Sequence, residues 1–552
     1  MNHRSIAAAL LAAVMTCTVL PAASAAGYTD ASGHWAQSYI TKVTDYGLME
    51  GTGGGVFGVD ANIDRASFLT VLCRMFDWET VTPSSPSFID CTPSYWGYGY
   101  VETAAAHGVI DKGGAFRPTD PISREEMAVM LVRALGYQDL ADDALDVSLP
   151  FTDVSASENR GYIALAWQFG LTNGVEENGA LHFKPNHSAS RAECAAMLVR
   201  VYERYISDID WLHAFYAVSS YDQIGLTDSM DGVSLGWARL EYSTDGGVTV
   251  NTTNANGNGW NIPQGASTAL SHFQQHNTPY YLCVFGSASD AVTLPDGTSS
   301  STVAAMLSTQ AGQDQAIAAL TALANDYGGL TIDFEGLKSP LKADYAAFIA
   351  KLRSALPAGK KLNICVQPGP YLTGYDFKSL GESCDKVILM AHDYRPPQSD
   401  IKVGATDTSA FALTPFSKIY DALTEITDPD TGVADRSKIA LAFSMDTTGF
   451  KLDENGAVAE AVYYRPSIAT LTQRLSQSDA QVTYVPSVRS SYVRYHDESG
   501  ALYQVWFESA QSITDKMDLA RMFGITGVSL WRLGNVPNSE SYDLWSAILA
   551  QR

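Results

Sequence analysis

Three segments in the N-terminal third of the chain share one spacing, and this repeat constrains the fold more than any other feature. In each segment an apolar residue precedes a glycine by seven positions, and a phenylalanine precedes an arginine by eight. The repeated residues are Ile40, Gly47, Phe57 and Arg65; Val101, Gly108, Phe116 and Arg124; and Ile163, Gly170, Phe183 and Arg191. Length varies only between the glycine and the phenylalanine, where a loop can absorb it. The spacing therefore predicts three copies of one small structural unit.

Each copy has the pattern of a helix, a turn, a short extended piece and a second helix. The glycine fits a left-handed cap at the end of the first helix. The residues before the arginines are natural N-caps, and they are Asp64, Ser123 and Ser190. An arginine in the first turn of a helix opposes the helix dipole, so something must compensate its charge. The compensating charge could come from a bound anion or from a neighbouring acid such as Glu125 or Glu193, and the spacing favours neither.

The sequence of the second copy, FIDCTPSYWGYGYVETAAAHGVIDKGGAFRPTDPISREEMAVMLVRAL, resembles an S-layer homology domain. The resemblance implies repeats at residues 27–84, 85–147 and 148–206, forming a helical module that binds an anionic secondary polymer of a bacterial wall. By resemblance the polymer-binding residues are Arg65, Arg124, Arg191, Trp35 and Trp96. Asp64 departs from the threonine of the family, and Glu158 stands where the other repeats have tryptophan. We therefore expect the third groove, and also the first, to bind more weakly.

The charge balance limits the possible partners. Lys and Arg total 36 against 60 Asp and Glu, giving a formal net charge of -24. A protein that binds nucleic acid needs a basic face, so we expect no nucleic-acid partner. The same charge argues against attraction to anionic lipid.

The first 26 residues read as a secretory signal peptide. Arg4 precedes the apolar stretch Ile6–Leu20, and Ala23-Ser24-Ala25 offers a small-residue cleavage site. No later segment has the length of apolar sequence that a membrane span needs. We expect a secreted protein associated with the cell wall, with no membrane span. Six cysteines follow the signal and are expected to be buried free thiols, with Cys73–Cys91 and Cys365–Cys384 bridges left open.

From about Asp208 the pattern changes to short β-rich runs that alternate with helical segments. Eight runs fit strands: Leu212–Val218, Val233–Leu240, Tyr280–Phe285, Leu330–Glu335, Leu362–Gln367, Val387–Ala391, Ile439–Phe443 and Gly527–Trp531. Eight parallel-type runs over residues 208–552 predict a (β/α)8 TIM barrel with insertions, and residues 447–512 form a diffuse one. An open doubly wound sheet is the alternative, although no phosphate-binding glycine motif supports it.

The run GGLTIDFEG at residues 328–336 carries most of the chemistry. Strand side chains alternate, so Thr331, Asp333 and Glu335 share one face, which would point into the barrel. Two acids this close raise one pKa through mutual repulsion and burial, and Glu335, nearer the mouth, is the expected holder of the proton. A structural pair with a partner such as Lys338 is the alternative interpretation.

The same run resembles the D-G-x-D-x-D-x-E motif of glycoside hydrolase family 18, a barrel with its catalytic acid on the fourth strand. The resemblance makes Glu335 the acid and Asp333 the carboxylate that orients the N-acetyl group of the substrate. Thr331 replaces a further Asp, and its hydroxyl could donate to Asp333 and keep it ionised. Further substrate-binding residues implied by the family's other strands, VILMAHDY and GVSLWRLG here, are Met390, His392, Asp393, Tyr394 and Trp531.

In the family pattern His392 occupies a tyrosine position, for which the adjacent Tyr394 could substitute, and Trp531 would form the floor of the sugar pocket. The resemblance implies hydrolysis of glycans containing β-linked N-acetylglucosamine, peptidoglycan or chitin-like, by substrate-assisted retaining catalysis. No cofactor and no metal are implied. A non-catalytic protein that binds acetamido sugars and a structural S-layer component are the alternative functions, kept open by Thr331 and His392.

Overall fold

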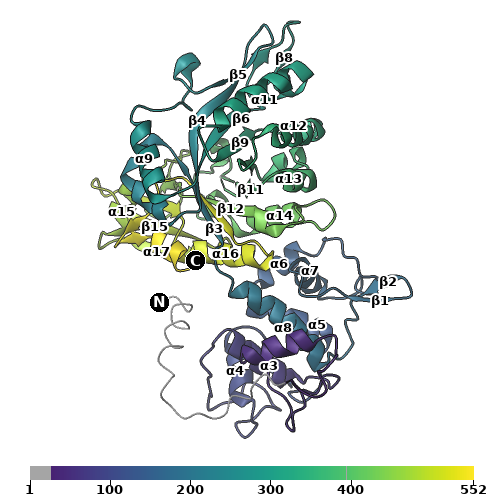
Figure 1. Cartoon of the computed structure of the whole chain (residues 1–552). Coiled ribbons are helices and arrows are strands. Elements are labelled where there is room, and N and C mark those ends of the chain that lie inside the picture. The colour runs from purple at the N-terminus through teal and green to yellow at the C-terminus, as the bar shows by residue number, and fades with distance from the viewer. Residues whose placement is uncertain (1–26, 393) are drawn as a thin grey trace. The chain divides into compact units, whose positions relative to one another are not determined.

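The computed structural model describes residues 27–392 and 394–552 (Figure 1). The expected signal peptide and Asp393 lie outside the described residues. The chain divides into two compact units, one ending at Ser207 and the other beginning at Asp208.

The N-terminal unit consists of the three predicted repeats, and each contributes a short first helix and a longer second one. The helices are α2 (Gln37–Asp45), α3 (Arg65–Met75), α4 (Tyr98–Ala106), α5 (Arg124–Ala134), α6 (Gln138–Asp143), α7 (Arg160–Gln168) and α8 (Arg191–Tyr205). The third repeat adds a hairpin of β1 (Val175–Glu177) and β2 (Ala180–His182). Gly47, Gly108 and Gly170 adopt the predicted left-handed conformation after the first helices, with φ of 70°, 74° and 61°.

The N-caps of the second helices are also as predicted. The side chains of Ser123 and Ser190 accept hydrogen bonds from the third residue of their helices, Glu126 and Glu193, whose carboxylates accept from the caps in return. Asp64 caps α3 in the same way through the backbone N–H of Ser67, but Ser67 forms no reciprocal bond with the cap.

The three repeats close around a ring of backbone hydrogen bonds. The N–H of Ile63 donates to Ala189 O at 3.1 Å, that of Ala189 to Ile122 O at 2.9 Å, and that of Ile122 back to Ile63 O at 3.0 Å. These residues stand two positions before the three repeated arginines, so the ring is a three-fold feature of the repeat. Each repeat satisfies a backbone group of the next.

The C-terminal unit is a closed barrel of eight parallel strands. They are β3 (Trp211–Tyr216), β4 (Gly232–Tyr242), β6 (Tyr280–Ser287), β9 (Gly329–Glu335), β10 (Lys361–Val366), β11 (Lys386–Leu389), β12 (Ile439–Ser444) and β17 (Gly527–Trp531). All eight match predicted runs. Because β3 pairs with both β17 and β4, the sheet closes and the doubly wound alternative is wrong.

Helices follow most of the strands and cover the barrel (Figure 1). They are α9 (Ala266–His276), α10 (Thr302–Leu307), α11 (Gln310–Ala324), α12 (Lys342–Ala355), α13 (Phe377–Ser383), α14 (Phe416–Ile426), α16 (Ala510–Met522) and α17 (Trp545–Leu549). The strand β5 (Val248–Asn251) extends β4 as an antiparallel hairpin. Short hairpins are formed by β7 (Val292–Thr293) with β8 (Ser299–Ser300) and by β18 (Asn538–Ser539) with β19 (Tyr542–Asp543).

The insertion between β12 and β17 is an ordered antiparallel sheet, and the expectation of a diffuse segment is wrong. Its strands, in spatial order, are β13 (Thr448–Lys451), β16 (Leu502–Phe507), β15 (Ser490–His496) and β14 (Gln481–Val485), accompanied by α15 (Ile468–Leu475). Phe450 and Trp506 are buried in a core of their own there.

The six cysteines of the described chain are all buried and free, as expected, and neither of the two open bridges forms. Across the part of the chain that the structure describes, no helix is long and apolar enough to cross a membrane.

Candidate active site and repeat grooves

The acid pair lies on β9, whose side chains alternate between the inside and the outside of the barrel as predicted. Phe334 points outward, with its ring 6.1 Å from that of Tyr345 and 6.2 Å from that of Phe348 on α12. Thr331 and Asp333 are buried inside the barrel, and Glu335 is half-buried where the strand ends. The acids therefore stand at the carboxyl ends of the barrel strands, where barrel active sites are built.

Asp333 is the deeper of the two acids. Burial, followed by the charge of Glu335, raises the pKa of Asp333 to about 8, although a hydrogen bond from the Cys365 thiol opposes this. Its Oδ1 is buried and has no hydrogen-bond partner among the described residues. Depth in the barrel therefore raises the pKa of Asp333, and the expectation that Glu335 holds the proton stays a prediction.

Thr331 does not donate to Asp333, so that expectation is wrong. The Thr331 hydroxyl lies 2.7 Å from Ser234 Oγ, which lies 2.8 Å from Nε2 of the buried His213. Nδ1 of His213 is 2.8 Å from Ser529 Oγ. Burial lowers the pKa of His213 to about 3, so this interior network is neutral, and it forms no hydrogen bond with Asp333.

Gln367, at the end of β10, holds Glu335 in place and was not identified from the sequence. Its Nε2 donates to Glu335 Oε2 at 3.0 Å, and its Oε1 accepts from the backbone N–H of Gly336 at 2.5 Å. The backbone N–H of Gln367 donates to the Tyr375 hydroxyl at 3.2 Å. No motif surrounds Gln367, and only its position after a predicted strand could have indicated it.

Aromatic rings gather near the end of β17. The half-buried Trp531 makes an edge-on contact with Phe215, with ring centroids 5.2 Å apart. Trp260 was not singled out from the sequence. Its ring centroid lies 6.3 Å from that of Trp531, and it stacks on the Phe285 ring with the centroids 4.8 Å apart and 3° between the ring planes. Flat apolar faces of this kind suit the C–H faces of sugar rings.

The remaining predicted residues follow β11. Met390 is buried in the barrel core that Trp531 packs against, and His392 is buried two residues further on. The Tyr394 hydroxyl donates to the backbone oxygen of Lys418 on α14 at 3.2 Å, and its substitution for the tyrosine of the family stays a prediction. Asp393 lies outside the described residues.

Among the described residues of the barrel unit, one group of side chains could hold a metal ion. Asp228 lies 2.8 Å from Nε2 of His272 and 3.1 Å from Nδ1 of His276. These residues precede the first residues of β4 and β6, at the opposite end of the strands from the acid pair. They play no part in the acid site.

Three grooves repeat around the N-terminal unit, and we name each by its arginine. Their volumes are about 300 Å³ for the Arg65 groove, about 250 Å³ for the Arg124 groove and about 180 Å³ for the Arg191 groove. Each takes its arginine from one repeat, most of its lining from the next, and one wall from the remaining repeat. That wall is Trp35 in the Arg124 groove, Trp96 in the Arg191 groove and Asn159 in the Arg65 groove.

This construction across repeats corrects where the sequence departures act. Glu158 precedes the Asn159 wall, so the missing tryptophan affects the Arg65 groove rather than the groove of the third arginine. Asp64 caps the helix that carries Ser67, which lines the Arg191 groove.

The repeated arginines share one set of contacts. Each Nε donates to the backbone oxygen of the repeated phenylalanine in the next unit, and each guanidinium lies over that ring; the pairs are Arg65–Phe116, Arg124–Phe183 and Arg191–Phe57. Arg65 also pairs with Glu126, and Arg124 with Glu193 at 2.7 Å. A neighbouring acid thus compensates two of the three charges. Glu125 instead accepts from Ser157 and Asn159.

A closed barrel with an acid pair at the end of its fourth strand, joined to a threefold helical module, defines a modular protein of the glycoside hydrolase class. Sequence comparison agrees with this architecture. The chain carries a domain of the glycosyl hydrolases family 18, matched over residues 285–535, and three S-layer homology domains, matched over residues 27–69, 87–128 and 150–195.

Among curated proteins, the chain is 23% identical over 233 residues to the cortical fragment-lytic enzyme of Bacillus anthracis, covering 40% of this chain and 50% of that one. It is 27% identical over 209 residues to an S-layer protein of Bacillus licheniformis, covering 37% and 23%. It thus spans half or less of these relatives. Among solved structures, a chitinase from Chromobacterium violaceum is 22% identical, covering 62% of this chain and 98% of that one, with a TM-score of 0.47.

Proposed function

We propose that this protein is a cell-surface glycosidase that hydrolyses glycans containing β-linked N-acetylglucosamine, peptidoglycan or chitin-like, while its repeats hold it to the wall. The observation that carries the proposal is the acid pair: Asp333 is buried with one unpartnered oxygen, and Glu335 stands beside it at the mouth of the barrel. The family 18 domain supports the same reaction class.

In the first step, Glu335 protonates the glycosidic oxygen as the bond to the anomeric carbon breaks. The oxygen of the substrate's own acetamido group attacks that carbon and forms an oxazolinium ring, so no second carboxylate is needed as nucleophile. Gln367 fixes the carboxyl of Glu335 for this transfer by donating to Oε2.

Asp333 orients the acetamido group, and the unpartnered Oδ1 supplies an acceptor for its N–H. As the oxazolinium forms, its positive charge favours an ionised Asp333, so the single proton shared by the pair resides on Glu335 for transfer.

In the second step, the ionised Glu335 takes a proton from water. The resulting attack on the anomeric carbon opens the oxazolinium and restores the acetamido group. Two displacements give net retention of configuration, and Glu335 regains its proton for the next cycle.

Wall attachment is supported by the three S-layer homology domains and by their grooves, each of which combines an arginine with a concave surface. The arginine suits the carboxylate of an acidic sugar, and the exposed Trp35 and Trp96 offer rings to the sugar itself.

The test uses the full chain with aryl N-acetylglucosaminides, chitooligosaccharides and peptidoglycan fragments. Glu335→Gln is expected to lower kcat at least a thousandfold, and Asp333→Asn at least a hundredfold, because each removes a group that acts on the reacting atoms. Glu382→Gln, on the exposed surface of α13, is the matched control and should retain full activity.

Binding of acetamido sugars without release of reducing ends, in both the unmodified chain and Glu335→Gln, would identify a lectin instead. If the chain neither binds nor cleaves these sugars, the barrel would instead be the scaffold of a surface-layer protein.

A further inference from the structure

Each repeat groove contains a second arginine, nine residues after the first arginine of the repeat that forms most of the lining. These residues are Arg133 in the Arg65 groove, Arg200 in the Arg124 groove and Arg74 in the Arg191 groove. The three grooves can therefore be compared position by position, and they differ in how their arginines are paired.

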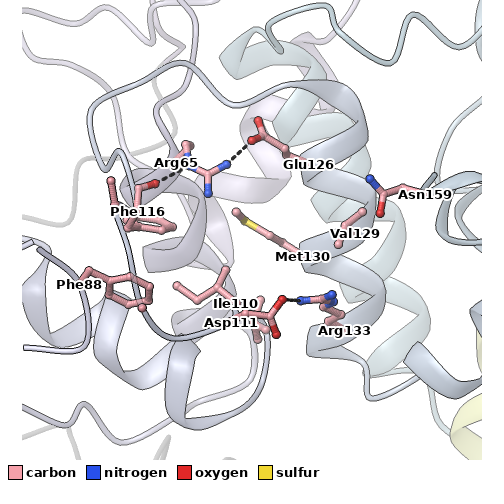
Figure 2. A pocket seen from close by; sticks show the side chains of 13 residues that line it. Arg65, Phe88, Ile110, Asp111, Phe116, Glu126, Val129, Met130, Arg133 and Asn159 are labelled. Carbon is pink, nitrogen blue, oxygen red and sulfur yellow. Dashed lines mark hydrogen bonds and ion pairs between the residues drawn. The ribbon is translucent and has the colours of Figure 1, made fainter. Parts of the chain in front are cut away.

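Both arginines of the Arg65 groove are already paired with carboxylates (Figure 2). Arg65 pairs with Glu126, which Arg117 also contacts at 3.1 Å, and Arg133 pairs with Asp111 at 3.1 Å. This groove also has Asn159 where each of the others has a tryptophan, so it presents neither an unpaired arginine nor an exposed indole ring.

The Arg124 groove is intermediate. Arg124 pairs with Glu193 at 2.7 Å, whereas Arg200 donates to the backbone oxygen of Leu171 and to the Tyr39 hydroxyl, both at 3.3 Å. Trp35, with 60% of its surface exposed, lines the groove.

The Arg191 groove has no such ion pair among the described residues. Ser67 occupies the third helical position that Glu126 and Glu193 occupy in the other repeats. Arg191 donates only to backbone oxygens, those of Phe57 and Glu50, and Arg74 donates to Leu48 O at 3.3 Å.

Three acids lie near the Arg191 groove without pairing with its arginines. One is Asp30, whose carboxylate accepts from the backbone N–H groups of residues 57–59. The Glu50 side chain is exposed at the groove, and the Asp64 carboxylate accepts from the N–H of Ser67 as the helix cap. The guanidinium groups therefore keep donors for an incoming carboxylate, and Trp96, 59% exposed, supplies the aromatic wall.

We propose that the Arg191 groove is the strongest of the three sites for an acidic sugar of the wall polymer, that the Arg65 groove is the weakest, and that Ser67 determines this order. The proposal rests on the wall attachment proposed above. An anion entering the Arg65 groove must compete with carboxylates already bonded to both arginines, whereas in the Arg191 groove it replaces none.

The test measures sedimentation of the full chain with walls isolated from the source organism, over a range of protein concentrations. Arg191→Ala should weaken binding at least tenfold, and Arg65→Ala, which removes the equivalent residue, no more than twofold. Ser67→Glu should weaken binding about as much as Arg191→Ala by pairing the arginine internally.

Ser67→Gln has the size of the glutamate variant without its charge, so it should weaken binding much less than Ser67→Glu does. Glu126→Gln should strengthen binding, because it frees Arg65 while an amide oxygen can still accept from the N-cap. Melting temperatures of all variants exclude unfolding as the cause of any loss.

Equal losses for Arg65→Ala and Arg191→Ala, or unchanged binding by Ser67→Glu, would overturn the order while leaving wall attachment intact. Failure of the unmodified chain to sediment, or equal sedimentation with walls stripped of their polymer, would overturn both. Competition by oligoglucuronate but not by polyglycerol phosphate would support a carboxylate ligand, and the reverse would overturn it.

Discussion

Gln367 bonds at once to the side chain of Glu335 and to the backbone N–H of the residue after it, so one amide from β10 fixes both the acid and the end of β9. A glutamine is suited to this because its donor and acceptor are separate atoms on one planar group. Glu335 therefore depends on a neighbouring strand for its orientation.

Gln367→Ala is expected to lower kcat about tenfold with little change in KM, since a hydrogen bond to a charged group contributes roughly 1.5 kcal/mol. Steady-state kinetics on an aryl glycoside would measure this. Because the lost bond also supports the ionised form of Glu335, which must be protonated for the first step, the alkaline limb of the pH profile should move to higher pH. An unchanged profile and kcat would exclude the orienting role.

The stability of the barrel should fall as pH rises from about 4 to about 8. Aspartate in an unfolded chain titrates near 3.9, whereas the pKa of Asp333 is about 8 in the folded state. Between these two pH values Asp333 is protonated in the folded state but ionised in the unfolded chain. The contribution of this proton to the free energy of unfolding is therefore complete at low pH and is lost as the pH rises past the folded pKa. Thermal unfolding of Asp333→Asn should depend less on pH in this range. Asp326→Asn, at an exposed position, is the control and should leave the pH dependence of thermal unfolding unchanged.

A buried ion pair joins α16 to the end of β16. Lys516 Nζ lies 2.6 Å from both carboxylate oxygens of Glu508, and also contacts Thr414 and Ser490. Lys516→Met should cost about 3–5 kcal/mol, because it leaves a buried charge without its partner. The double variant with Glu508→Gln should cost less than the sum of the single changes. Unfolding of the barrel unit by calorimetry would measure both.

The surface pair Lys361–Asp385 provides the comparison for this prediction. Lys361→Met should cost less than about 1 kcal/mol, since exposed pairs contribute little. Equal costs at the two sites would contradict the distinction by burial.

Trp260→Ala should raise KM for chitooligosaccharides about tenfold and affect a small aryl glycoside much less, because the ring adds a stacking surface beside Trp531. Trp78→Ala, which removes a tryptophan from the repeat unit, should leave both values unchanged. A loss of kcat on both substrates would instead mean that Trp260 supports the acid pair.

Local pattern was sufficient to predict the repeated helices and all eight barrel strands. Caps such as Ser123 and the left-handed Gly47 are set by residues adjacent in sequence, and the burial of a parallel strand appears as an apolar run. The inward face of β9 followed from alternation alone.

Contacts between distant segments were the part that sequence could not supply. The partner of Thr331 is Ser234, 97 residues earlier, and Trp260 reaches the mouth from beyond a hairpin. The raised pKa of Asp333 follows from its depth in the barrel, which decides desolvation and which a linear pattern does not encode. Likewise, Asn159 reaches the groove of an arginine two repeats away.

The backbone ring through Ile63, Ala189 and Ile122 fixes the copy number of the repeats. An open solenoid tolerates gain or loss of a unit at its ends, whereas a closed circuit has no end at which to add one. Deleting a single repeat would leave a backbone N–H on one side of the gap and a backbone C=O on the other without hydrogen-bond partners. Evolution of this module can therefore vary the chemistry of each groove independently, but not the number of grooves.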